Sequence, residues 1–126
     1  MSDEGIQEQY VELLRRSGSA ETYRAGEPIF RAGDPADHMY LVDSGTVSLH
    51  EGEHVVETVG PSGLFGEMAV VDRRPRSASA IAESDCELIT FDKRRFWFLV
   101  QETPFFAEVV MRAVAGRIRN MNQALT

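Results

Sequence analysis

The segment Phe65-Gly-Glu-Met-Ala-Val-Val-Asp-Arg-Arg-Pro-Arg-Ser-Ala-Ser79 joins a Gly-Glu turn, a short apolar run and an isolated Pro-Arg pair. Gly66 precedes a run long enough for one helical turn, whose free backbone N–H groups attract an anion. Arg76 precedes an alternating run of small residues, so its guanidinium has room to bind a phosphate through two hydrogen bonds. The ionised carboxylate of Glu67 only accepts hydrogen bonds, which suits a sugar hydroxyl. The segment predicts a site for a small ligand with one phosphate and one sugar hydroxyl.

Each of these residues also has a purely structural interpretation. Gly66 is then an ordinary glycine between a strand and a turn, and Glu67 forms an ion pair with an arginine that holds the loop. Arg73 and Arg74 are expected to be solvated side chains of a surface loop.

Length and composition restrict the class of protein. The 126 residues predict one domain with a proper core, and 43% hydrophobic and 26% charged residues are typical of a soluble globular protein. A net charge of −7 argues against a nucleic-acid binder or a ligand of acidic membranes. The single Cys86 excludes an intramolecular disulfide and a zinc site rich in thiolates. No targeting signal or membrane span is visible, so we expect a cytoplasmic protein.

Residues 19–91 show short apolar stretches that are separated by polar turns about every eight to twelve residues. The expected strands include 28–30, 39–42, 46–50, 55–59, 77–82 and 87–91. Because Asp43-Ser44-Gly45 separates 39–42 from 46–50, we expect these two strands to form a hairpin with glycine in the turn. The pattern predicts a mainly β (α+β) fold, a sandwich or a jelly roll.

Helices are expected at both ends of this β region, over 3–16, over 93–100 with Asp92 as the N-cap, and over 105–125. In the first, Ile6, Tyr10, Leu13 and Leu14 share a face. The apolar positions of the last helix, at steps of three and four, are Phe106, Val109, Val110, Ala113, Val114, Ile118, Met121 and Leu125. The whole chain, 1–126, is expected to be one domain: an N-terminal helix in 1–18, the β region in 19–91 and helices in 92–126.

Two motifs identify a family. The first is Phe65-Gly66-Glu67, Ala69 and Pro75-Arg76-Ser77-Ala78-Ser79, and the second is Gly33-Asp34, Asp37, Tyr40, Val42, Gly45 and Val47. In this order and spacing they resemble the cyclic nucleotide-binding domain family, and with the flanking helices the resemblance covers almost the whole chain. It implies an eight-stranded jelly roll with N-terminal and C-terminal helices packed on it, and it makes 65–79 the phosphate-binding cassette (below, the cassette). The pair Ser62-Gly63 departs from the commoner Gly-Asp, which we expect to alter the loop rather than ligand contacts.

The resemblance also implies residue roles. Arg76 is expected to pair with the cyclic phosphate and Glu67 to hold the ribose 2′-hydroxyl. Backbone amides of Gly66, Glu67 and Ala78 and the side chain of Ser77 complete the cradle. The last helix is expected to supply base contacts. The expected ligand-binding residues are Phe65, Gly66, Glu67, Met68, Ala69, Arg76, Ser77, Ala78, Arg119 and Asn122, with Met121 as a further candidate.

The resemblance favours a receptor that carries out no reaction, needs no cofactor or metal, and responds to its ligand by moving the C-terminal helix as a lid. We expect cAMP rather than cGMP as the ligand, although Ser77 by itself does not decide between them. The long apolar face of the last helix favours pairing with a second copy, and the downstream effector protein is not indicated. Family transcription factors continue into a helix-turn-helix, whereas this sequence stops at Thr126, so we expect a sensor domain without a DNA-binding domain, either free-standing or cut from a longer protein.

Two alternatives stay open. The same fold with a degenerate site would serve as a protein–protein interaction module. A cupin-like metal enzyme would need histidine and carboxylate ligands that converge in the barrel, and the chain offers only His38, His50 and His54, none in an H-x-H pair.

Overall fold

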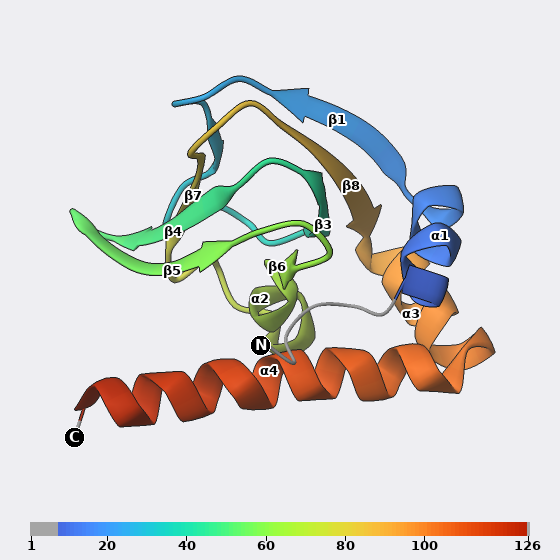
Figure 1. Ribbon diagram of the computed structural model, residues 1–126. Helices are drawn as coiled ribbons and strands as arrows, with labels where there is room; N and C mark the ends of the chain where they lie inside the picture. The colour runs from blue at the N-terminus through green and yellow to red at the C-terminus, as the bar shows by residue number, and fades with distance from the viewer. Residues whose placement is uncertain (1–7, 126) are drawn as a thin grey trace.

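Two four-stranded sheets face each other in the computed structural model, which describes residues 8–125 and the side chains of 11–119 (Figure 1). The first sheet contains, in spatial order, β1 (Ser19–Tyr23), β8 (Cys86–Asp92), β3 (His38–Ser44) and β6 (Leu64–Phe65). The second contains β2 (Pro28–Phe30), β7 (Ser79–Ala82), β4 (Val47–Glu51) and β5 (His54–Val59). Neighbouring strands are antiparallel throughout. The expected eight-stranded jelly roll is confirmed.

The central strand β3 is buried on both faces, which is why it appears in the sequence as a continuous apolar run. Met39 and Leu41 point away from the second sheet and join a core beneath the helices. Tyr40 and Val42 point to the other side and join a core between the two sheets. The domain therefore has two apolar layers, with the first sheet between them.

The expected hairpin between 39–42 and 46–50 is wrong. β3 and β4 lie in different sheets, and Gly45 turns the chain from one sheet to the other at a φ of 87°. A Cβ on Gly45 would lie 2.4 Å from the backbone oxygen of Asp85, so this corner packs directly against the loop before β8. A glycine between two apolar runs suits both a hairpin and such a corner, and only the distant partner strands distinguish the two. The hairpin in this region joins β4 to β5.

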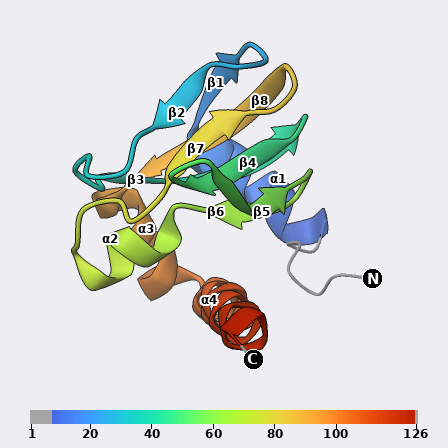
Figure 2. The same cartoon turned by 90° about the vertical axis from the view of Figure 1, so that its left-hand side faces the viewer.

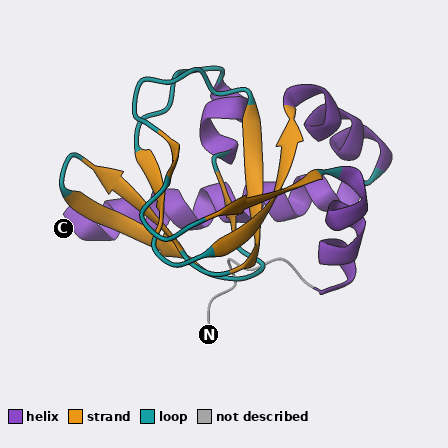
Figure 3. Cartoon of the chain, turned by 90° about the horizontal axis from the view of Figure 1, so that it is seen from above, coloured by secondary structure: helices purple, strands orange, loops and turns teal. Residues whose placement is uncertain are grey.

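Helices cover the outer face of the first sheet. The helix α1 (Glu8–Ser17) buries Val11 and Leu14 there, whereas residues 3–7 of the expected helix lie outside the described residues. The helix α3 (Lys93–Glu102) begins as expected after Asp92, whose side chain accepts a hydrogen bond from the Arg95 backbone N–H. Seen from above, α1 and α3 lie at one end of the strands (Figure 3).

The long helix α4 (Pro104–Leu125) runs along the strands and packs on α3 and on the short helix α2 (Glu67–Asp72). Figure 2 looks down α4 and shows α2 beside it, below the strands. Phe106 and Val110 fix α4 by inserting into the core beneath the helices. This packing places the cassette between the jelly roll and α4. No helix within residues 8–125 is long and apolar enough to cross a membrane.

Candidate ligand-binding site

The cassette begins where β6 ends. β6 pairs with β3, and Gly66 then turns the chain into α2 with a φ of 79°. A Cβ at this position would lie 2.9 Å from Nη1 of Arg76. Gly66 is therefore required twice, for its left-handed backbone and for the close approach of the arginine.

Arg76 is buried, with a relative exposure of 5%, and its contacts come from backbone and aromatic groups. Its Nη1 donates to the carbonyl of Gly66 at 2.7 Å, its Nη2 donates to the carbonyl of His38, and its Cζ lies 4.0 Å from the centre of the Phe30 ring. Its Nε has no hydrogen-bond partner within the described part of the chain. Burial lowers the pKa of the guanidinium from its ordinary value, against the smaller opposing effects of Tyr40, Asp37 and Asp34.

The backbone of Arg76 is also held. Its N–H donates to the carbonyl of Asp34 at 2.9 Å, and its carbonyl accepts from the N–H of Gly33 at 2.8 Å. Gly33 has a φ of 93°. The Gly33-Asp34 motif thus holds the backbone of Arg76 through main-chain hydrogen bonds, although it lies more than forty residues earlier in the sequence.

Among the described side chains, 11–119, no carboxylate lies within ion-pair distance of Arg76, whereas several other arginines have such a partner. A buried cation that is balanced only by carbonyl dipoles and a ring face keeps its capacity for a charge-assisted bond to an anion. Arg76 is in this sense available for a ligand.

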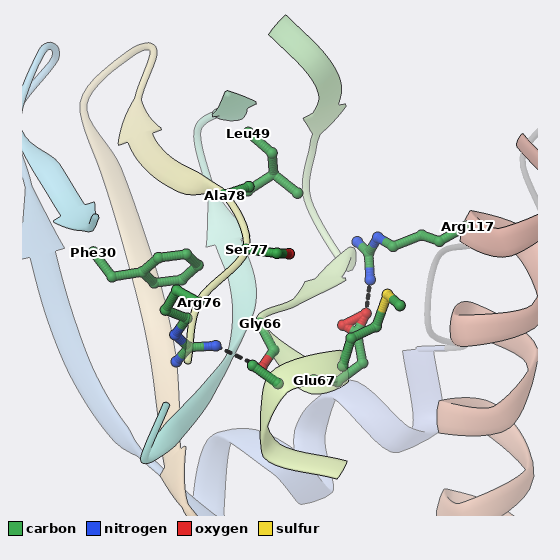
Figure 4. Close-up of a pocket in the computed structure, with 10 residues that line it drawn as sticks. Phe30, Leu49, Gly66, Glu67, Arg76, Ser77, Ala78 and Arg117 are labelled. Atoms are coloured by element: carbon green, nitrogen blue, oxygen red, sulfur yellow. Dashed lines mark hydrogen bonds and ion pairs between the residues drawn. The ribbon is translucent and has the colours of Figure 1, made fainter. Parts of the chain in front are cut away.

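Glu67 has a different environment. Its side chain is 1% exposed, and its Oε1 forms an ion pair with Nη1 of Arg117, from α4 (Figure 4). The Nε of Arg117 donates to Oε1 and Oε2 of Glu57 on β5 at 2.8 and 3.1 Å, and its Nη2 donates to the carbonyl of Leu64 on β6. One guanidinium therefore connects α4 to β5, β6 and the cassette.

A cavity of about 80 Å³ lies between these two arginines. Figure 4 shows Arg76 and Phe30 on one side of it and Glu67 with Arg117 on the other. The cavity is lined by Phe30, Leu49, Gly66, Glu67, Met68, Ala69, Arg76, Ser77, Ala78 and Arg117. Seven of the expected site residues are in this set, so the structure brings most of the cassette prediction together around one space.

Three expected site residues are not in this lining. Phe65 is buried in the core between the sheets, where its ring stacks on Tyr40 with centroids 5.0 Å apart. Arg119 is exposed on α4. The side chain of Asn122, like that of Met121, lies outside the described residues. Phe65 lies outside the lining because β6 turns that side chain inward, and Arg119 because α4 presents a different arginine; their part in the site stays a prediction.

That arginine is Arg117, which, like Phe30 and Leu49, lines the cavity but was not among the residues expected from the sequence. A signal for Arg117 exists in the sequence. Phe106, Val110 and Ala113 are buried at steps of four and three, and the next step of four reaches residue 117. A charged residue that continues a buried stripe is expected to have a buried partner of opposite charge. Arg119, two positions on, is rotated by about 200° around the helix.

The departure at Ser62-Gly63 affects the loop before the cassette. Ser62 has a φ of 69°, a left-handed conformation that few residues other than glycine adopt. The N–H of Ser62 donates to the carbonyl of Val42, and the carbonyl of Gly63 accepts from Val42, so the loop is fastened to β3. Neither residue lines the cavity.

The alternative of a metal enzyme gains no support from the described side chains, among which no group of three His, Cys, Asp or Glu residues could hold a metal ion.

Comparisons with known proteins agree with this fold. The chain is 35% identical over 126 residues to the cyclic AMP receptor protein of Thermus thermophilus, a match that covers 96% of this chain and 58% of that protein. The crystal structure of the Thermus thermophilus catabolite activator protein superposes with a TM-score of 0.83 at 35% identity, over 96% of this chain and 59% of that one. A protein of a cyclic-GMP-dependent signalling pathway that regulates bacterial phytopathogenesis superposes with a TM-score of 0.80 at 26% identity, over 91% of this chain and 95% of that one.

The chain thus spans a little over half the length of the Thermus protein. The family model described as the cyclic nucleotide-binding domain matches residues 20–103, which include the complete cassette and all eight strands except Ser19, the first residue of β1. On this match, and on the fold and cassette geometry above, the chain belongs to the cyclic nucleotide-binding domain family.

Proposed function

We propose that this chain is a receptor for a cyclic nucleotide, that it carries out no reaction, and that its response is a movement of α4. The observation that supports this most strongly is Arg76, a buried guanidinium at the edge of a cavity with no carboxylate partner among the described residues. A cyclic phosphate, with a single negative charge, would supply the missing anion.

The other cassette residues fit the rest of the ligand. Glu67 lies on the same cavity as Arg76 and, as an ionised carboxylate, accepts the hydrogen bond of the ribose 2′-hydroxyl. The backbone amides of Gly66, Glu67 and Ala78 and the hydroxyl of Ser77 are available for the phosphate. Phe65 contributes by fixing the start of the cassette in the core rather than by contact.

The size of the cavity supports a response that includes α4. About 80 Å³ is small beside the roughly 300–1,000 Å³ typical of ligand pockets. A nucleotide must therefore widen the space, and α4 forms one side of it through Arg117, which shares Glu67 with the ribose. A ligand that binds the wider arrangement more tightly shifts the population towards it.

The proposed ligand is cAMP rather than cGMP. The similarity to a cyclic AMP receptor protein over nearly the whole chain supports this choice, while the similarity to a protein of a cyclic-GMP-dependent pathway keeps cGMP as the alternative. The base of the nucleotide would lie towards α4, where Arg117 or residues that follow it in the helix would contact the base.

We propose in addition that two copies pair through α4. Ala107, Met111, Val114 and Ile118 follow one another at steps of four, three and four, the spacing of a coiled-coil seam. Met111 and Ile118 are 64% and 47% exposed, and this seam borders an apolar groove of about 390 Å³ whose other walls include Val71 and Trp97. Sedimentation equilibrium measures the pairing, and Ile118→Glu is expected to convert a dimer into monomers; a chain that is monomeric at every concentration would contradict it.

Titration calorimetry tests the receptor function, with cAMP and cGMP as ligands and 5′-AMP as the acyclic control. We expect binding of cAMP in the micromolar range or tighter, weaker binding of cGMP, and little heat from 5′-AMP, whose extra phosphate charge does not fit a single guanidinium. No heat from either cyclic nucleotide at high micromolar concentration would refute the proposal and favour the interaction module with a degenerate site.

A further inference from the structure

Glu57 lies on β5, outside the cassette, and its side chain does not line the cavity. It is nevertheless held in a fixed place, because β5 pairs with β4 and puts Glu57 directly opposite Leu49. Residues opposite each other in an antiparallel pair have their side chains on the same face of the sheet. Leu49 lines the cavity, so Glu57 projects from the same face as the cavity wall, one strand further out.

From that position Glu57 binds the edge of Arg117 that points away from the cassette. Both of its carboxylate oxygens accept from Nε, at 2.8 and 3.1 Å, and the side chains of Glu57 and Arg117 are 23% and 11% exposed. The three nitrogens of Arg117 thus contact three different elements: Nε contacts β5, Nη2 contacts the Leu64 carbonyl and Nη1 contacts Glu67.

An arginine side chain has several rotatable bonds and ends in a planar guanidinium, so the orientation of that guanidinium is set by its hydrogen-bond partners. With Nε and Nη2 held by Glu57 and by Leu64, Nη1 is the remaining nitrogen and faces Glu67. Without Glu57, one anchor is left besides Glu67 itself. Because the Glu67 side chain is only 1% exposed, water could not solvate its carboxylate if the guanidinium of Arg117 turned away from it.

We propose that Glu57 is a positioning residue of the nucleotide site: it holds Arg117 so that the guanidinium fixes the Glu67 carboxylate for the ribose hydroxyl. This inference rests on the proposed function and assigns to that site a residue that lies outside the cassette and contacts no ligand. In this positioning role Glu57 acts through Arg117 and affects the sugar end of the ligand.

A second effect of Glu57 has the opposite sign. Its negative charge repels an anionic ligand, and removing it would strengthen binding to a small extent, since the group is partly exposed and screened. The two effects are separable. Charge repulsion persists without Arg117 and acts equally on ligands with and without a 2′-hydroxyl, whereas positioning requires both.

The test is a double-mutant cycle read by the dissociation constants of cAMP and 2′-deoxy-cAMP. The variants are Glu57→Gln, Arg117→Gln and the pair together, with Glu53→Gln as a matched control on the exposed turn of the same hairpin. We expect Glu57→Gln to weaken cAMP binding about fivefold in the unaltered chain and less than twofold beside Arg117→Gln. For 2′-deoxy-cAMP the loss is expected to be less than twofold, and Glu53→Gln is expected to change neither constant by as much as twofold.

Each other outcome overturns the inference. Equal losses with and without Arg117, equal losses for both ligands, or tighter binding by Glu57→Gln would show that Glu57 does not act through Arg117 on Glu67. If Arg117→Gln does not fold, Arg117→Lys takes its place, because lysine keeps the charge but cannot contact three elements at once. If the unaltered chain binds neither cyclic nucleotide, the proposed function falls and the positioning role falls with it; if it binds and no coupling appears, only the positioning role is wrong.

Discussion

Arg76 and Arg117 face each other across one cavity and are held in opposite ways. Arg76 comes from the cassette, and its guanidinium contacts two carbonyls and the Phe30 ring. Arg117 comes from a helix about forty residues later, and its guanidinium contacts two carboxylates and one carbonyl. The first has charge to offer a ligand, while the second is already neutralised by the protein.

Under the proposed function, this difference would separate ligand binding from the response of α4. A buried cation without an acidic partner can bind an anionic ligand. In the empty site, carbonyl dipoles and the face of an aromatic ring reduce the free-energy cost of burying its charge. A cation between two carboxylates fastens elements to one another, and it changes its contacts only when one of those carboxylates gains a new partner. In the proposed complex the ribose hydroxyl would be such a partner for Glu67, so the ligand would bind through Arg76 and act on α4 through Arg117.

Removal of Arg76 is expected to have the largest effect. Arg76→Ala leaves the ligand phosphate in the cavity without a counter-charge, which costs roughly 2–5 kcal/mol of binding, or thirtyfold and more in affinity for cAMP. Calorimetry measures the change, and Arg74→Ala, on the exposed part of the same segment, is the control. Unchanged affinity would show that Arg76 is not the phosphate ligand.

Removal of Arg117 is expected to act on stability. Arg117→Gln leaves the Glu67 carboxylate buried without its partner, and we expect the free energy of unfolding to fall by about 3 kcal/mol. Urea denaturation measures it. Because the loss comes from an uncompensated charge, the double variant with Glu67→Gln should recover a large part of it. Strict additivity of the two substitutions would mean that their ion pair is not coupled.

A methyl group at Gly66 probes the Arg76 side alone. Gly66→Ala strains a left-handed backbone, at a cost of about 1–2 kcal/mol, and places a Cβ 2.9 Å from Nη1 of Arg76. The control is Gly26→Ala, where φ is also positive, at 90°, but nothing lies within 4 Å of the new Cβ. Similar losses of thermal stability are expected for both, with a severalfold loss of cAMP affinity for Gly66→Ala only. A loss of affinity in both would point to a general effect of backbone strain.

The smallest effect is expected at Arg119. Since its side chain is exposed and α4 presents Arg117 to the cassette, Arg119→Ala should change cAMP affinity less than twofold. Calorimetry on this variant beside Arg117→Gln decides which arginine of α4 belongs to the site. A larger loss for Arg119→Ala would restore the prediction made from the sequence and require α4 to rotate on binding.

The cassette was predictable from the sequence because its requirements are local. Gly66 has to turn the chain and admit a side chain that starts ten residues later, and a short segment can show both. The same holds for the N-cap at Asp92, whose partner is three residues away. The burial of Phe65 in the core between the sheets could not be read from the motif, since the direction of its side chain depends on the pairing of β6 with β3.

Other features depended on partners that the sequence does not name. The segment around Gly45 has the pattern of a hairpin, and the partners of β3 are β8 and β6 instead. Arg117 is one of several arginines on an amphipathic helix, and its role follows from how α4 docks on α2 and β5. Glu57 has no motif at all.

The sequence by itself determined the family, the fold class and the cassette that lines the cavity, because backbone conformation and short-range spacing are written in neighbouring residues. Only the tertiary structure decided which strands pair across the corner at Gly45 and which arginine of α4 meets Glu67. The physical reason is that periodicity records which face of an element is buried but not what it is buried against. Contacts between charges that are far apart in sequence exist only once the core has set the position and rotation of each helix and strand.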